Sequence, residues 1–254
     1  MEYKKIAIIL AAGGGIRLKR ITFKKPKPMV VINGISIIRN LVEDLIESGI
    51  DEIVILVGYM ADMVRNHLAD YRSKVKITFL ENKKWATTNN IYTLWLARDY
   101  LLDGFYLFEA DIYCEKSIID DLINDERENI IVVDKFTSLM NGTVVIGKYP
   151  ASIVKKMYLK KDQKKNFNFL NAYKTVNFYK IGKLLANPFF VEKLKNHINK
   201  KNVNFYYEII ISELIDQGFI FYTLKAGGRK WWEIDTQEDF NVARKIFFNQ
   251  NTKR

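Results

Sequence analysis

The first half of the chain alternates short apolar runs with longer segments in which apolar residues recur at helical spacing. We expect strands at Ile6 to Leu10, Glu52 to Val57, Val75 to Leu80 and Phe105 to Phe108. Helices are predicted between them, over Ile35 to Glu47, Met60 to Tyr71 and Ile91 to Tyr100. This alternation is typical of βαβ units, in which helices cover both faces of a largely parallel sheet.

The pattern changes after about residue 130. Shorter strands are predicted at Ile130 to Val133, Thr143 to Ile146, Ile153 to Tyr158 and Thr175 to Tyr179. The segment from Lys160 to Asn168 is charged, rich in asparagine and aperiodic, which indicates a surface loop that could act as a lid. We expect these strands to be antiparallel additions and to form a small substrate-facing subregion.

Periodic segments return in the last quarter of the chain. Helices are predicted at Phe189 to Asn199, Phe205 to Asp216 and Gln237 to Phe248, with a strand at Phe219 to Leu224. The whole pattern predicts an α/β fold, a Rossmann-like mixed and mostly parallel sheet flanked by helices. We expect a single domain over residues 1–254.

A glycine-rich turn follows the first strand, and two cations come after it. The run Ala11-Ala12-Gly13-Gly14-Gly15-Ile16-Arg17-Leu18 is followed ten residues after Arg17 by Lys27. Glycines let backbone N–H groups approach an anion closely. The dinucleotide fingerprint is excluded because Leu18 stands at its last glycine, and the P-loop is excluded because no G-K-[ST] follows. The sequence therefore predicts a different kind of phosphate-binding loop.

Two acidic steps could hold a metal ion. They are Glu109-Ala110-Asp111, at the end of an apolar strand, and Glu233-Ile234-Asp235. Strand alternation places the acids of each step on one face, and carboxylate oxygens are ligands that Mg²⁺ prefers. Asp111 could instead be an ordinary loop acid. Near Asp235, Thr236 and Asp239 resemble a capping box, so these acids could serve a helix start as well.

Charge and cysteine content narrow the class of protein. The formal charge of +11 over 254 residues suits nucleic acid, a membrane surface or small acidic substrates. The lysines are scattered, and no nucleic-acid-binding motif is present. No apolar run approaches the ~20 residues of a membrane span. The single cysteine, Cys114, excludes an intrachain disulfide and favours a reducing compartment, with the cytoplasm as the expected location.

The N-terminal motifs together resemble the start of the sugar-phosphate nucleotidyltransferases. The matching pattern is L-A-A-G-x-G-x-R-L, then T-x-x-x-P-K ending at Lys27, then Asn33-Gly34. The resemblance implies a nucleotide-diphospho-sugar transferase-like fold. It further implies that Arg17 binds the β- and γ-phosphates, that Lys27 binds the α-phosphate, and that Asp111 and Asp235 hold Mg²⁺. The departures are Gly14 and Ile16 in the loop and residues 23–25 before Pro26.

A second resemblance concerns the branch of the family. The run Asn89-Asn90-Ile91-Tyr92-Thr93-Leu94 is similar to the phosphocholine cytidylyltransferases and their phosphonate relatives. With further matches at residues 132–135, 140–145, 173–179 and 206–208, the resemblance is greatest to the 2-aminoethylphosphonate cytidylyltransferases. It implies a cytidylyltransferase that joins CTP to a small phosphonate or phosphate and releases pyrophosphate. The residues expected to bind the nucleotide are Leu10, Ala11, Ala12, Gly13, Gly14, Gly15, Asn89 and Asn90.

An amine-bearing acceptor needs a carboxylate and aromatic faces around its ammonium group. The candidates for this role are Trp231, Trp232, Tyr206, Tyr207 and Glu208, and of these we favour Tyr207, Glu208 and Trp232. Lys174 could bind the acceptor's phosphonate; core packing is the alternative for each aromatic. We expect no nucleic-acid or membrane partner, and a homodimer is one option. The alternative functions are transfer to a sugar 1-phosphate or inositol phosphate, or a basic nucleic-acid-binding module.

Overall fold

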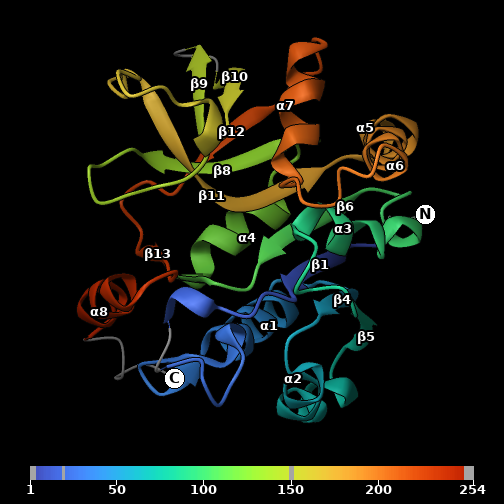
Figure 1. Ribbon diagram of the computed structural model, residues 1–254, viewed down its shortest axis with the longest axis vertical. Coiled ribbons are helices and arrows are strands. Elements are labelled where there is room, and N and C mark those ends of the chain that lie inside the picture. The colour runs from blue at the N-terminus through green and yellow to red at the C-terminus, as the bar shows by residue number, and fades with distance from the viewer. Residues whose placement is uncertain (1–3, 19–20, 149–151, 249–254) are drawn as a thin grey trace.

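A nine-stranded mixed sheet forms the centre of the protein in a computed structural model, which describes residues 4–18, 21–148 and 152–248 (Figure 1). Four neighbouring strands are parallel: β5 (Lys76–Glu81), β4 (Glu52–Val57), β1 (Ile6–Ala11) and β6 (Phe105–Glu109). The sheet continues with β11 (Ala172–Ile181), β8 (Ile130–Lys135), β12 (Tyr222–Lys225), β10 (Ile153–Tyr158) and β9 (Val144–Lys148).

The long strand β11 marks the change from the first half of the sheet to the second. It is antiparallel to both β6 and β8, and it also pairs with β9. Strands β9 and β10 are antiparallel to each other, whereas β12 runs parallel to β8. The prediction of a mixed sheet with antiparallel additions after about residue 130 is therefore confirmed, but the sheet is not mostly parallel, because four of its strand pairings are parallel and five are antiparallel.

Helices cover both faces of this sheet, as the alternating pattern predicted. On one face α1 (Ile37–Glu47), α2 (Ala61–His67) and α4 (Lys116–Asn124) share an apolar cluster with the strands. On the other face α3 (Asn90–Trp95), α6 (Val191–Asn199) and α7 (Glu208–Asp216) pack around a second cluster, close to the short helix α5 (Lys183–Leu185). A third cluster joins α8 (Gln237–Ile246) to the hairpin of β2 (Val31–Ile32) and β3 (Ile35–Ser36).

A second small sheet positions the two acidic steps. Strand β7 (Ile112–Cys114) pairs antiparallel with β13 (Trp231–Glu233), so that Ile112 lies opposite Glu233. In Figure 1 this pair lies beside α8, away from β9 and β10. The pairing brings segments more than a hundred residues apart to the carboxyl end of β6, next to the residues that follow β1.

Some element boundaries differ from the predicted ones. The helix expected to reach Tyr100 ends at Trp95 and is followed by a 3₁₀ turn at Arg98–Tyr100, because the backbone switches to i→i+3 hydrogen bonds. The strand expected from Phe219 begins only at Tyr222, since the N–H of Phe219 donates to Leu214 and closes the end of α7. Helix α4 and strand β7 are additions to the sequence interpretation.

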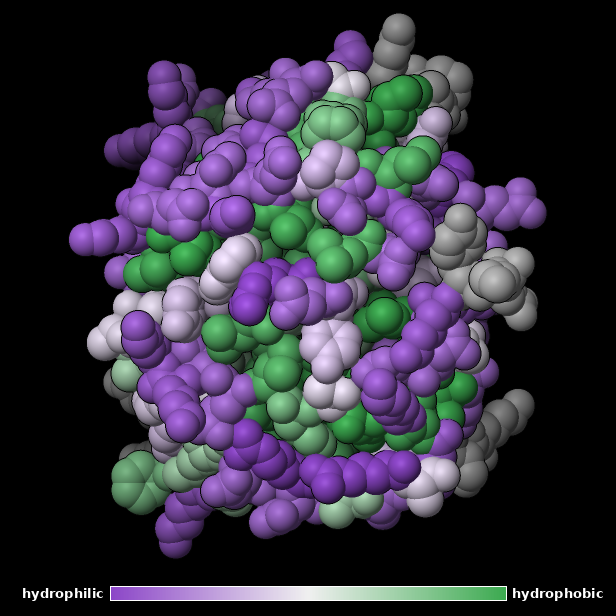
Figure 2. All heavy atoms as spheres, turned by 90° about the vertical axis from the view of Figure 1, so that its right-hand side faces the viewer, coloured by the Kyte–Doolittle hydropathy of each residue, from purple (hydrophilic) through white to green (hydrophobic). Residues whose placement is uncertain are grey.

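The segment from Lys160 to Asn168 contains one 3₁₀ turn, Lys160–Asp162, and otherwise lacks regular structure, as predicted for a loop. Figure 2 shows a mainly hydrophilic surface over one side of the molecule, interrupted by smaller hydrophobic areas. None of the helices within the described residues combines the length and the apolar character that a membrane crossing requires.

Candidate functional site

A cavity of about 990 Å³ opens at the carboxyl ends of β1 and β6, the edge at which α/β sheets bind their ligands. The glycine loop, the start of α3, both acidic steps and the beginning of α7 contribute to its wall. Of the residues predicted for the site, all except Tyr207 line this cavity. Segments that are distant in the sequence thus meet in one place.

The glycine loop is folded tightly against the residue that carries the second cation. Gly15 has a positive φ of 59°, and a Cβ at this position would lie 2.8 Å from the Cβ of Lys27. Thr22 Oγ1 donates a hydrogen bond of 2.9 Å to the Gly15 carbonyl. Only glycine fits this position, because both the backbone conformation and the available space exclude a side chain.

Lys27 lies at the centre of the charged part of the site. Its Nζ donates hydrogen bonds of 2.6 Å to Asp111 Oδ2 and of 2.6 Å to Asp235 Oδ1. Burial alone would lower the pKa of Lys27, but the two carboxylates outweigh this effect and raise it well above its ordinary value. The ammonium group is therefore permanently charged at neutral pH.

Arg17 adds a second positive charge at the mouth of the cavity. Its guanidinium lies 2.9 Å from Asp235 Oδ1, and its side chain is 65% exposed. Burial would raise the pKa of Asp235, yet Lys27 and Arg17 hold it below its ordinary value. Asp235 is therefore ionised at neutral pH, and among the described residues the exposed arginine has other donors available for an incoming anion.

The backbone around Asp235 is fixed by the start of α8. Thr236 and Asp239 form a capping box, and the Asp235 N–H also donates to Asp239 Oδ2 at 3.2 Å. The N–H of Ile234 donates to the carbonyl of Asp111 at 2.9 Å, which ties the two acidic steps together. The capping interpretation and the position of Asp235 in the cavity therefore hold at the same time.

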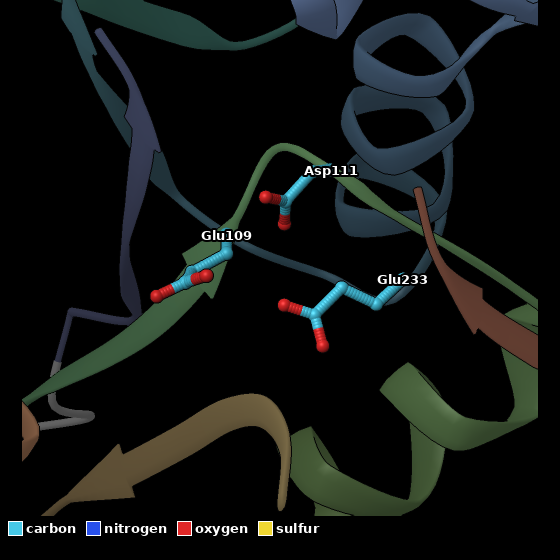
Figure 3. A group of neighbouring side chains, drawn as sticks. All are labelled: Glu109, Asp111 and Glu233. Atoms are coloured by element: carbon cyan, nitrogen blue, oxygen red, sulfur yellow. The ribbon is translucent and has the colours of Figure 1, made fainter. Parts of the chain in front are cut away.

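Three carboxylates converge between β6 and β13, as Figure 3 shows. One oxygen each from Glu109, Asp111 and Glu233 lie within 4.8 Å of one another. The sequence placed each glutamate on the same face as its aspartate but proposed only the aspartates as metal ligands. Burial raises the pKa of Glu109 well above its ordinary value, and the neighbouring carboxylates add to this shift. The cluster therefore favours a cation among its members.

Amide side chains hold Glu109 in this group. Asn90 Nδ2 lies 3.5 Å from Glu109 Oε1, and Asn177 Nδ2 lies 3.4 Å from Oε2. Asn90 Oδ1 also accepts the N–H of Tyr207 at 2.9 Å, and the Asn89 side chain caps α3 by accepting the N–H of Asn90. The side chains of Asn89 and Asn90 therefore use most of their polar atoms to hold the backbone and Glu109 in place at the cavity wall.

The far end of the cavity contains a buried glutamate. Glu208 is 7% exposed, and its Oε1 accepts a hydrogen bond of 3.3 Å from Thr143, whereas Oε2 is buried with no hydrogen-bond partner among the described residues. Burial raises the pKa of Glu208 to about 7. A cationic group that reached this oxygen would satisfy it and favour its ionised form.

Lys174 and the aromatic residues surround this end of the cavity. The buried Lys174 Nζ lies 3.1 Å from Glu233 Oε2 and donates to the Thr175 carbonyl at 2.6 Å. Trp232 is half-buried, and its indole donates to Asp239 Oδ1 at 3.3 Å. Tyr207 is fully buried with its ring edge-on to Tyr179, and Tyr206 lines the cavity in its place.

The sequence interpretation also missed Trp85, which belongs to the same W-A-T-T-N-N segment as the two asparagines. Its ring lines the cavity beside the glycine loop. Asn82, three residues before Trp85, is 1% exposed and donates to Thr88 and Thr93. The available signal was an aromatic residue four positions before the asparagine pair.

The chain is similar in sequence and fold to nucleotidyltransferases. CMP-5'-(3-aminopropyl)phosphonate synthase of Streptomyces rubellomurinus is 26% identical over 239 residues, which are 93% of this chain and only 38% of the relative. Choline-phosphate cytidylyltransferase of Streptococcus pneumoniae is 26% identical over 259 residues, covering 96% of this chain and 99% of the relative.

The solved structure of CTP:phosphocholine cytidylyltransferase from Streptococcus pneumoniae has the same fold, with a TM-score of 0.79 at 24% identity. The superposition covers 96% of this chain and 99% of that one. The predicted fold class and the resemblance to cytidylyltransferases are thereby confirmed. The family model described as "Nucleotidyl transferase" matches residues 6–234, which is most of the chain. The protein therefore belongs to the nucleotidyl transferase family.

Proposed function

We propose that the protein is a Mg²⁺-dependent cytidylyltransferase that transfers CMP from CTP to a small zwitterionic phosphonate or phosphate and releases pyrophosphate. The favoured acceptor is 2-aminoethylphosphonate, and phosphocholine is next. The observation that carries the proposal is the position of Lys27, between Asp111 and Asp235 and against Gly15 of the glycine loop. A phosphate-binding loop, a buried cation and two acids thus share one cavity.

The nucleotide end of the cavity combines backbone donors with two cations. N–H groups of Gly13 to Gly15 can bind phosphate oxygens, and the exposed Arg17 suits the β- and γ-phosphates. Lys27 suits the α-phosphate, where negative charge develops in the transition state. In the absence of nucleotide the Lys27 ammonium group is bound to the two aspartates. When the nucleotide binds, this group contacts the α-phosphate instead.

A divalent cation fits the oxygen donors beside Lys27. Asp111 and Asp235 offer hard oxygen ligands, and Asp111 Oδ1 is buried without a partner among the described residues. Both carboxylates already gather around one cation, the Lys27 ammonium. When bound, Mg²⁺ supplies charge neutralisation to the triphosphate. Its ligands from the chain would be Asp111 and Asp235.

The reaction is a single in-line displacement. A phosphonate or phosphate oxygen of the acceptor forms a bond to the α-phosphorus of CTP, while the bond from that phosphorus to the bridging oxygen breaks and pyrophosphate leaves with the electron pair. The attacking oxygen is already ionised at neutral pH, so the chain needs no general base. Lys27 and Arg17 stabilise charge, and the cavity walls hold the two anions in line.

The acceptor end carries more carboxyl groups than cations. Glu109, Glu208 and Glu233 interact electrostatically there, and Lys174 is the buried cation beside them. An ammonium group on the acceptor would satisfy the buried oxygen of Glu208, while Trp232 and Tyr206 offer aromatic surface nearby. The relatives named for aminopropylphosphonate and choline phosphate support an amine-bearing acceptor.

The proposal is tested by pyrophosphate release in a grid of substrates. CTP, UTP, ATP and GTP are each combined with Mg²⁺ and with 2-aminoethylphosphonate, phosphocholine or glucose 1-phosphate. We expect a signal only for CTP with the two amine-bearing acceptors, and a stronger one for 2-aminoethylphosphonate. Turnover confined to glucose 1-phosphate would contradict the proposed acceptor class, and turnover with another nucleotide would contradict the proposed base.

A further inference from the structure

The indole of Trp85 lies directly against the glycine loop. A Cβ built on Gly14 would lie 3.2 Å from Cζ3 and 3.8 Å from Cε3 of this ring. The same Cβ would also lie 3.7 Å from Cγ of Tyr59. Gly14 has no positive φ, so a larger residue there would be crowded by the aromatic ring and not strained by the backbone conformation.

Trp85 cannot easily move away, because the residues behind it are fixed. Tyr59 packs edge-on against the indole, with ring centroids 5.0 Å apart and an interplanar angle of 63°. The N–H of Tyr59 donates to the Ala12 carbonyl at 3.1 Å, which ties this support to the end of β1. A Cβ on Gly58 would lie 2.8 Å from the Cβ of Trp85 and 2.7 Å from the Ala12 carbonyl oxygen, so the packing here is already close.

The loop that carries Trp85 is fixed from its other side by Asn82. The N–H of Trp85 donates to the Asn82 carbonyl at 3.2 Å, and the N–H of Lys84 donates to Asn82 Oδ1 at 2.9 Å. The Asn82 side chain is bound in turn to Thr88 and Thr93. The indole of Trp85 is therefore held in place by its neighbours, and the middle of the glycine loop packs against it.

We propose that Trp85 and Gly14 are a matched pair that sets the position of the glycine loop, which makes Trp85 a nucleotide-positioning residue. The inference rests on the proposed function, in which this loop binds the triphosphate of CTP. Because the indole supports Gly14, it determines how far the loop's N–H groups project into the cavity. A residue larger than glycine at position 14 pushes the loop away from the indole and toward the space that the phosphates need.

A double-mutant cycle tests the pairing, with Gly14→Ala, Trp85→Leu and the double variant. In the Trp85 background, Gly14→Ala should raise the KM for CTP by about tenfold, within the range of coupling between residues in contact. The KM for the acceptor should stay the same. In the Trp85→Leu background the new methyl group has space, so the same substitution should change the KM for CTP by less than about threefold.

The matched control is Gly13→Ala in the same two backgrounds. A Cβ on Gly13 meets no atom within 4 Å, so its effect should be equal with and without the indole. Trp85→Phe serves as a milder second variant if Trp85→Leu does not fold, which thermal unfolding will show. Equal penalties for Gly14→Ala in both backgrounds, or matching changes in the KM of CTP and acceptor, would overturn the inference. A wild-type protein that does not bind CTP would instead contradict the proposed function.

Discussion

Replacing Lys27 with methionine should make the protein bind a divalent cation more tightly in the absence of nucleotide, even though it should slow the reaction. The Lys27 ammonium lies 2.6 Å from an oxygen of Asp111 and 2.6 Å from an oxygen of Asp235, the two proposed metal ligands. A metal ion that enters must share these carboxylates with a fixed positive charge. The lysine therefore competes with the metal until the nucleotide draws it away.

The size of this competition follows from Coulomb's law. A divalent ion and an ammonium group that share two carboxylates sit about 4 Å apart, where their repulsion is about 2 kcal/mol even at the dielectric constant of water. That free energy corresponds to about thirtyfold in a dissociation constant. The dielectric constant inside the cavity is lower, so we expect Lys27→Met to tighten Mn²⁺ binding by at least thirtyfold.

The measurement is a titration of nucleotide-free protein with Mn²⁺, with the free ion followed by electron paramagnetic resonance. The matched control is Lys156→Met, which removes a lysine that is also paired to a carboxylate, Asp216, at 2.7 Å, but lies outside the cavity wall. This control should leave Mn²⁺ affinity within about twofold, since exposed pairs contribute little. Unchanged or weaker Mn²⁺ binding by Lys27→Met would refute the reasoning.

Three further predictions concern other parts of the site. Asp111→Asn should lower turnover by about 10²–10³ and weaken Mn²⁺ binding, both measured beside the wild type; wild-type turnover would exclude a metal role. Burial raises the pKa of Glu208 to about 7, so this carboxyl is neutral below pH 7 and acceptor affinity should increase as pH rises through 7. Glu208→Gln should remove that dependence from the pH profile of the acceptor KM. Thr236→Ala should cost about 1 kcal/mol in urea unfolding because the capping box that opens α8 is lost.

The glycine loop and its cations could be predicted because their relation is local. Gly15, Arg17 and Lys27 lie within thirteen residues of one another, and the space between Gly15 and Lys27 follows from one short stretch of backbone. The meeting of Asp111 with Asp235 depends instead on the pairing of β7 with β13, strands of three residues each. Such short strands carry almost no periodic signal, so family resemblance alone could connect the two aspartates.

Of the two neighbouring tyrosines that the sequence offered, Tyr206 and not the favoured Tyr207 lines the cavity, and the reason is geometric. The sequence predicted a helix from Phe205, whereas α7 begins at Glu208. Successive residues of a helix point about 100° apart, so an error of a few residues at a helix start changes which side chain faces the cavity. Tyr207 packs into the core beside Tyr179, while Tyr206 is 54% exposed and lines the cavity.

Gly14 shows why a variable position in a motif is not a neutral one. Within the loop pattern it stands between two glycines, and its departure from the family pattern removes no charged group. In the folded chain it faces Trp85, which is 71 residues further along, and the residue tolerated at position 14 depends on the size of that side chain. The spacing of residues in the sequence predicts a phosphate-binding loop, but only the folded structure shows which side chain packs against that loop.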